Sequence, residues 1–166
     1  MAVAAVDDLL GFHIIAHTEH ADFSVSGDGE DSAKISGSKM ELAKGVTAGT
    51  WTKSGQPLDS TAVARLSEME ALDAICGSTD RNMENFFVQA DQRGRLRGVT
   101  GIDNGYAFGE SAHILRNREE LPQQVYQQGY GVSAPVCLDY AFPAITNELY
   151  GKIKSLTPQV LERKLR

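Results

Sequence analysis

The sequence has few of the residues that mark the most easily recognised classes of small protein. Only Cys76 and Cys137 are cysteines among 166 residues, so no disulfide framework organises the fold. Two reduced thiols in a cytoplasmic protein are expected, with a single bridge as the alternative. No uninterrupted apolar run reaches membrane-spanning length. The apolar start, residues 1–6, lacks a basic segment and is followed by Asp7 and Asp8, so it does not resemble a signal peptide.

Positive charge is also scarce. The 22 acidic residues outnumber the 16 basic ones, which gives a formal net charge of -6. Because nucleic-acid backbones favour clustered lysines and arginines, we expect no nucleic acid as the main partner. The length and the 42% hydrophobic composition allow one globular domain with its own core.

Two acidic motifs carry most of the functional information. Residues 79–85 read Thr-Asp-Arg-Asn-Met-Glu-Asn, and residues 101–105 read Gly-Ile-Asp-Asn-Gly. Phosphoryl transfer from ATP needs one carboxylate that orients the acceptor hydroxyl. It also needs a second carboxylate and an amide oxygen that hold Mg²⁺. Asp80, Asp103 and Asn85 suit these three roles.

A helix is predicted directly before the first motif. Asp59 or Ser60 can cap its N-terminus, and its apolar stripe runs to about Cys76, where Gly77 ends it. This stripe predicts a helix buried along one face. We therefore expect a rigid helix to deliver the loop that contains Asp80 to the edge of a cleft.

The region between the motifs predicts a β-hairpin. Residues 86–88 and 96–102 are strand-like, and residues 91–94 form a turn between them. Such a hairpin brings Asn85 and Asp103 back to the same end, as a shared metal ion requires. Either motif alone would be explained as a turn or a local cap, so the prediction depends on finding both.

The two motifs resemble those of the phosphatidylinositol 3- and 4-kinase superfamily, most closely the type II phosphatidylinositol 4-kinases and their small bacterial relatives. In that family an Asp-Arg-x-x-x-Asn loop and a β-hairpin precede Ile-Asp-Asn-Gly-x-Ala-Phe, and residues 102–108 here read Ile-Asp-Asn-Gly-Tyr-Ala-Phe. The resemblance implies an ATP- and Mg²⁺-dependent kinase whose acceptor is a phosphoinositide or a protein hydroxyl. It implies that Asp80 orients or deprotonates the acceptor and that Arg81 fixes the catalytic loop. Asn85 and Asp103 would hold Mg²⁺.

The resemblance also implies a fold, an α+β kinase-like domain across residues 1–166. Residues 1–38 would be the remnant of a small lobe, residues 39–45 the hinge, and residues 46–166 a mostly helical large lobe. In the hinge, the backbone and one apolar side chain would hold adenine. The residues expected to do so are Met40, Glu41, Leu42 and Ala43. An ordinary edge strand or a turn of helix is the alternative for this stretch.

The chain departs from the family at its start. A predicted helix over residues 3–10 resembles the end of the kinase αC helix, whose phosphate-supporting Glu would fall at or before Ala2. We find no counterpart of the family's strand Lys or of its glycine-rich loop, so we expect an N-terminally incomplete small lobe. A catalytically impaired pseudokinase or binding module is therefore the alternative function.

The rest of the chain predicts connecting structure. Residues 12–16 and 23–25 are predicted short strands, and residues 26–38 are a predicted mobile loop that is rich in Gly, Ser and Asp. Two closing helices are predicted, one with an apolar stripe from Ile145 to Leu156 and one that starts at Pro158.

Basic residues outside the motifs suggest weaker hypotheses. Arg93, Arg95 and Arg97 alternate, which predicts that they share one face of the hairpin, either as a protected edge or as a peripheral contact with anionic lipid. The region 111–131 is placed as an activation segment that recognises the acceptor, and it includes His113, Arg116 and Arg118. The histidines at positions 13, 17 and 20 lack a familiar zinc-ligand spacing, so no zinc site is expected.

Overall fold

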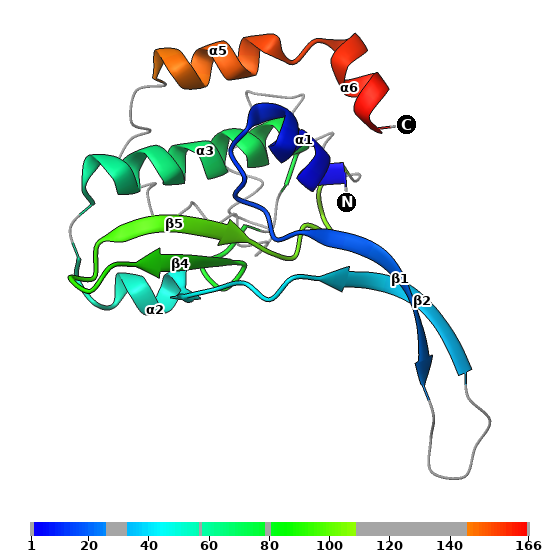
Figure 1. Cartoon of the computed structure of the whole chain (residues 1–166). Coiled ribbons are helices and arrows are strands. Elements are labelled where there is room, and N and C mark those ends of the chain that lie inside the picture. Colours follow the sequence, from blue (N-terminus) through cyan, green and yellow to red (C-terminus); the bar gives the residue numbers. More distant parts are fainter. Residues whose placement is uncertain (1, 26–32, 57, 79–80, 109–145, 166) are drawn as a thin grey trace, which may run out of the picture.

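The computed structural model describes residues 2–25, 33–56, 58–78, 81–108 and 146–165, which form an α+β protein (Figure 1). This confirms the expected α+β class. Helices and strands follow one another in the order α1 Ala2–Leu10, β1 Thr18–Val25, β2 Ala33–Met40, β3 Val46–Thr47, α2 Ala48–Thr52, α3 Ser60–Cys76, β4 Phe86–Ala90, β5 Leu96–Gly101, α5 Asn147–Ser155 and α6 Pro158–Leu165.

The described strands form two small antiparallel sheets, one of β1 and β2 and one of β3, β4 and β5. The predicted hairpin around residues 91–94 is confirmed. Phe86 pairs with Gly101 at its base, and the Gly94 N–H donates to the Asp91 carbonyl at 2.9 Å in its turn. The chain therefore leaves β5 beside the point at which it enters β4.

The predicted helix before the first motif is also confirmed. The Asp59 carboxylate accepts a hydrogen bond from the Ala62 N–H at 2.9 Å, which satisfies one free donor of the first turn of α3. Gly77 ends the helix in the left-handed conformation, with φ 63°. Both ends of α3 are thus determined by local sequence signals.

A single hydrophobic core joins most of the described elements. Helices α3 and α2 lie on either side of the β4–β5 sheet, and α1 packs against α3 and α6 (Figure 1). The resemblance assigns α1 to the small lobe, yet its apolar residues share this core with α3. The core consists of Val3, Val6, Leu10, Phe12, Ile14, Ala48, Trp51, Ala62, Leu66, Met69, Leu72, Cys76, Phe86, Val88, Leu96, Val99 and Leu149.

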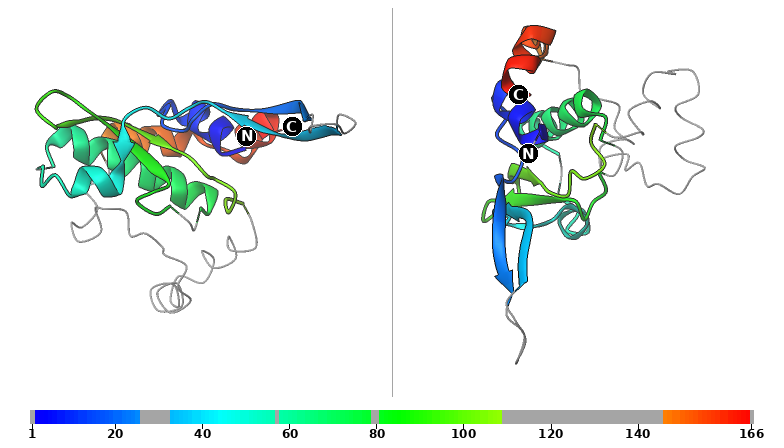
Figure 2. Two further views of the ribbon diagram at one scale, coloured as in Figure 1. Left: turned by 90° about the horizontal axis from the view of Figure 1, so that it is seen from below. Right: turned by 90° about the vertical axis from the view of Figure 1, so that its right-hand side faces the viewer.

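The β1–β2 hairpin projects from this core, as all three views show (Figures 1 and 2). Its second strand corrects one prediction, because residues 33–38 belong to β2 and not to a loop. They pair in register with β1, with Ile35 opposite Phe23, so backbone pairing prevails over a composition rich in Gly and Ser. The other part of that predicted loop, residues 26–32, lies outside the described residues.

Residues 12–16 differ from the prediction as well. They form only an isolated bridge between Ile15 and Gly101 and not a strand. Asp7 explains their course, because its Oδ2 accepts the Ile14 and Ile15 N–H groups, both at 2.9 Å. This segment is therefore held by the Asp7 side chain of α1 and by Gly101 at the end of β5, which exchanges backbone hydrogen bonds with Ile14 and Ala16.

The two closing helices are confirmed as α5 and α6. Thr146 caps α5, and its hydroxyl accepts from the Leu149 N–H at 3.1 Å. Pro158 is the first residue of α6, a position where a missing N–H costs little. Ile145 lies outside the described residues. None of the helices in the described part of the chain has the length and apolar composition needed to cross a bilayer.

Candidate functional site

The described part of the candidate site begins at Arg81. Asp80, the predicted acceptor-orienting residue, lies outside the described residues, as do the predicted activation segment 111–131 and Cys137. The site is therefore built from the other residues of the two motifs and from the elements that hold them.

Arg81 is the centre of a buried hydrogen-bond network and is 3% exposed. Its Nη1 donates to the carbonyl oxygens of Asn85 and Ile102, both at 2.8 Å. Its Nη2 donates to Asn104 Oδ1 at 2.6 Å. Nε and Nη2 also donate to the Asp73 carboxylate, both at 3.0 Å. One guanidinium group thus connects α3 with both strand ends at the base of the β4–β5 hairpin.

Asp73 is a site residue that the sequence analysis missed. It lies on α3 between the core residues Met69 and Cys76, and it is itself buried. Burial raises the pKa of its carboxyl, and the charge and hydrogen bonds of Arg81 act in the opposite direction. A buried acid on a helix is either paired or kept neutral, and this signal would have marked Asp73 together with Glu70.

The hairpin brings the two predicted magnesium ligands to one end. The Ile102 N–H donates to the Asn85 carbonyl at 3.0 Å, so Asp103 is one residue beyond this contact. Asp103 is exposed and has a φ of 50°, in the left-handed region that non-glycine residues seldom adopt. The loop after it is anchored because the Phe108 N–H donates to the Cys76 carbonyl at 2.8 Å.

Gly101 shows how closely the network is packed. A Cβ at this position would lie 2.9 Å from Ile15 Cδ1 and 3.1 Å from Arg81 Nη1. Both distances are shorter than ordinary van der Waals contacts. The glycine before Ile102 and Asp103 in the second motif is therefore explained by the guanidinium group of the first motif.

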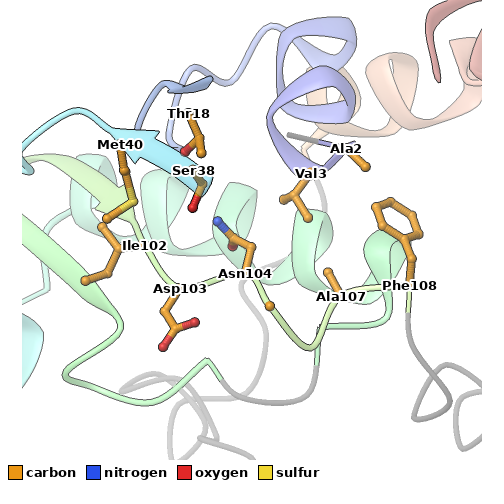
Figure 3. A pocket seen from close by; sticks show the side chains of 11 residues that line it. Ala2, Val3, Thr18, Ser38, Met40, Ile102, Asp103, Asn104, Ala107 and Phe108 are labelled. Carbon is orange, nitrogen blue, oxygen red and sulfur yellow. The ribbon is translucent and has the colours of Figure 1, made fainter. Parts of the chain in front are cut away.

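A pocket of about 680 Å³ opens beside Asp103 (Figure 3). It lies between the start of α1, the inner ends of β1 and β2, and the loop after β5. Figure 3 shows the Asp103 carboxylate pointing away from Thr18 and Ser38. Asp103 is the one acidic residue among the described lining residues, and none of them is basic. They are Ala2, Val3, Thr18, Ser38, Met40, Ile102, Asp103, Asn104, Gly105, Ala107 and Phe108.

The four predicted adenine-binding residues divide between two cavities. Met40 lines the large pocket together with Asp103. Glu41, Leu42 and Ala43 line a separate cavity of about 170 Å³, and Leu42 is 88% exposed. The structure therefore brings Met40 into the same pocket as a predicted metal ligand, and it does not bring the other three into that pocket.

The backbone of the predicted hinge is held at both of its ends. The Glu41 N–H donates to the His17 carbonyl at 2.8 Å. At the other end, a Cβ on Gly45 would lie 2.1 Å from the Val88 carbonyl oxygen, so only glycine fits against β4. Residues 41–45 thus connect the projecting hairpin to the core sheet along a defined path.

Oxygen atoms dominate the candidate metal ligands. Asp103 and Asn85 would provide carboxylate and amide oxygens, which suit Mg²⁺ better than softer metals. Asn85 is not among the residues that line the large pocket. Within the described ranges, no group of three or more His, Cys, Asp and Glu side chains could hold a metal ion.

The arginines of the hairpin do not share one strand face, which corrects a prediction. Arg93 lies in the turn, and Arg95 precedes β5. Arg95 Nη2 and Arg97 Nη2 approach Asp91 Oδ2 at 3.0 and 2.9 Å. Loss of solvent raises the pKa of Asp91, but hydrogen bonds from Arg97 and Arg95 outweigh it, and the pKa lies below its usual value. Two of the three arginines therefore have an anionic partner within the protein.

Neither the protein-family models nor the curated proteins include a match to this chain. The family resemblance of residues 79–108 therefore stays a prediction from the motifs.

Proposed function

We propose that the protein is an ATP- and Mg²⁺-dependent phosphotransferase with a fold of the phosphatidylinositol 3-/4-kinase type. One observation carries the proposal: Arg81 holds the chain segments of Asn85 and Asp103 together, and Asp103 and Met40 line the same pocket. A predicted nucleotide-binding residue and a predicted metal ligand from distant parts of the sequence thus share one cavity.

The reaction transfers the γ-phosphoryl group of ATP to an alcohol of a phosphoinositide or a protein. The acceptor oxygen forms a bond to the γ-phosphorus while the bond to the β,γ-bridging oxygen breaks and ADP leaves. The hydroxyl proton passes to the Asp80 carboxylate, the role that the resemblance gives to this residue. Mg²⁺, when bound, neutralises phosphate charge, and Asp103 and Asn85 would hold it.

Preorganisation of the site supports this proposal. All five N–H donors of the Arg81 guanidinium have acceptors within the protein, so its position does not depend on a ligand. Polar groups that are already oriented need little reorganisation during phosphoryl transfer. The left-handed backbone conformation of Asp103 also supports the proposal. Residues in such strained conformations are held there by the surrounding structure and are often found at functional sites.

The order of the elements supports the kinase-like fold. The β1–β2 hairpin is followed by the extended residues 41–45, then by α3, the first motif and the β4–β5 hairpin. This is the order that the resemblance implies for the small-lobe strands, the hinge and the catalytic region. The large pocket is lined from both sides of the proposed hinge.

A nucleotide-binding module without transferase activity is the second candidate. The observation that favours it is the absence of a basic side chain among the described residues that line the pocket. The negative charge of a bound triphosphate would then be neutralised chiefly by Mg²⁺, and the protein would bind the γ-phosphate only weakly.

Calorimetry with ATP tests the proposal. We expect the wild type to bind Mg·ATP, and we expect Asp103→Asn to weaken this binding at least tenfold, because Asn tolerates the left-handed backbone but lacks the charge. Asp22→Asn is the matched control, since Asp22 lies on β1 and does not line the pocket. Equal Mg·ATP binding by the wild type and Asp103→Asn would refute the site.

A transfer assay then separates the two candidate functions. Radiolabelled γ-phosphate is offered with phosphoinositide vesicles in one arm and with a mixture of protein acceptors in the other. Label in lipid or in protein identifies the acceptor class. Binding of Mg·ATP without transfer to either acceptor would support the binding module.

A further inference from the structure

Asp73 contacts the described residues on both sides of positions 79–80. Its backbone carbonyl accepts the Ser78 N–H at 2.9 Å, directly before residues 79–80. Its carboxylate accepts hydrogen bonds from Arg81, directly after them. A single helical residue therefore sets the separation of Ser78 and Arg81.

The geometry of Arg81 transmits this restraint to the other motif. The guanidinium group is planar and rigid, so its N–H directions cannot be adjusted one at a time. The Nε–Nη2 edge of the guanidinium group faces the Asp73 carboxylate and fixes the plane, and Nη1 then reaches the Asn85 and Ile102 carbonyls. A rotation that lost Asp73 would also displace these carbonyl contacts.

A charge is required at position 73. Arg81 is always ionised and is buried, and Asp73 is the only acidic side chain that it contacts among the described residues. Removal of one partner from a buried ion pair leaves the other charge buried without compensation, which is strongly unfavourable. A neutral residue of the same shape would therefore let the guanidinium move toward solvent.

We propose that Asp73 is a positioning residue for phosphoryl transfer. It contacts Ser78 and Arg81, the described residues on either side of positions 79–80, and through Arg81 it fixes their place beside the segments that carry Asn85 and Asp103. It touches neither nucleotide nor metal, because it does not line the pocket. This role rests on the proposed function.

The test compares the kinetics of Mg·ATP hydrolysis by the full chain, with water as the acceptor. We expect Asp73→Asn to lower kcat at least tenfold and to change KM for Mg·ATP less than threefold, because the pocket lining is intact. Asp73→Glu keeps the charge and should recover part of the lost kcat. Glu68→Gln is the control on the same helix, since Glu68 pairs with Arg65 and Lys152 and does not contact Arg81, and its kcat should equal that of the wild type.

A purely structural role predicts a different result. The kcat would then fall only in proportion to the folded fraction, measured by circular dichroism, and that outcome would overturn the proposal. If Asp73→Asn does not fold, Arg81→Lys replaces it, since Lys keeps a positive charge beside Asp73 but cannot reach both carbonyls. A folded Arg81→Lys variant with wild-type kcat would also overturn it.

Failure of the proposed function gives a separate signature. If the wild type turns over Mg·ATP neither with water nor with the phosphoinositide and protein acceptors, the phosphotransferase function fails and the role of Asp73 fails with it. If the wild type is active and Asp73→Asn matches it, only the role of Asp73 is refuted.

Discussion

The two β-hairpins of this protein are both antiparallel, but one is exposed to solvent and the other is packed in the hydrophobic core. Neither β1 nor β2 contains a fully buried residue. In contrast, Phe86 and Val88 of β4 and Leu96 and Val99 of β5 all belong to the core. Backbone hydrogen bonds contribute modestly to net stability, so pairing alone leaves the first hairpin weakly held. The candidate site lies at the base of the second, where packing fixes positions.

Side chains on the projecting hairpin show the same contrast. Phe23 and Ile35 are opposite each other on the two strands, yet they are 40% and 52% exposed. Phe86 in the core hairpin is 1% exposed. An aromatic residue therefore contributes a cross-strand contact in one hairpin and a central part of the core in the other.

Truncation of Phe86 and Phe23 should give the largest difference in stability between the two hairpins. We expect Phe86→Ala to lower the free energy of unfolding by about 3–5 kcal/mol, because it leaves a cavity in the hydrophobic core. Phe23→Ala should lower it by less than about 1 kcal/mol. Urea denaturation monitored by circular dichroism measures both values. Equal losses would show that the projecting hairpin is buried in solution.

Substitution of a glycine in each hairpin tests how much space surrounds the backbone. Gly101→Ala should cost roughly 1–3 kcal/mol, since the added Cβ presses on Ile15 and Arg81. Gly37→Ala in β2 should be neutral or stabilising by about 0.5 kcal/mol, because the nearest atom, Phe23 Cε2, would lie 3.7 Å away. Thermal melts compare the two. A neutral Gly101→Ala would contradict the close packing of Arg81.

The acids near the two hairpins should respond differently to pH. Burial, followed by the charge of Asp73, raises the pKa of Glu70 on α3 from 4.5 to about 7. Neither of its carboxyl oxygens has a hydrogen-bond partner in the structure. The folded state thus keeps a proton that the unfolded chain loses near pH 4.5, and the stabilisation is lost as the pH rises toward 7.

Glu70→Gln should remove this pH dependence. Between pH 4.5 and 8, we expect the stability of the variant relative to the wild type to rise by roughly 1–3 kcal/mol. Glu19→Gln on β1 is the control, because the Lys39 hydrogen bond lowers the pKa of Glu19 and the group is exposed. Denaturation at a series of pH values gives both curves, and parallel curves for wild type and Glu70→Gln would disprove the burial of this acid.

The smallest effect is expected for the ion pair of the projecting hairpin. Lys39 Nζ lies 2.9 Å from Glu19 Oε1, and both side chains are more than half exposed. Such surface pairs contribute about 0–1 kcal/mol to the free energy of unfolding, so Lys39→Ala should lower the melting temperature by only a few degrees. High salt screens the pair, so the difference between Lys39→Ala and the wild type should disappear there. A larger shift that persists in 1 M salt, roughly a 3 Å screening length, would indicate that this hairpin packs against another surface.

Local signals explain which elements could be predicted. The helix before the first motif has a capping Asp59, an apolar stripe and a terminal Gly77, all within one short segment. The β4–β5 hairpin has two apolar strands and a polar turn. Residues 33–38 lacked such signals, because their Gly and Ser residues form a strand only through pairing with β1.

The candidate site divides in the same way. The sequence by itself determined the two motifs, the helix before them and the hairpin that returns Asp103 to Asn85, because these depend on contacts between near neighbours. Only the tertiary structure decided that Arg81 is buried, that Asp73 is its partner and that Met40 shares a pocket with Asp103. Those facts depend on desolvation and on tertiary packing; an acid in the α3 sequence signals that a buried carboxyl is present, but not which group it contacts.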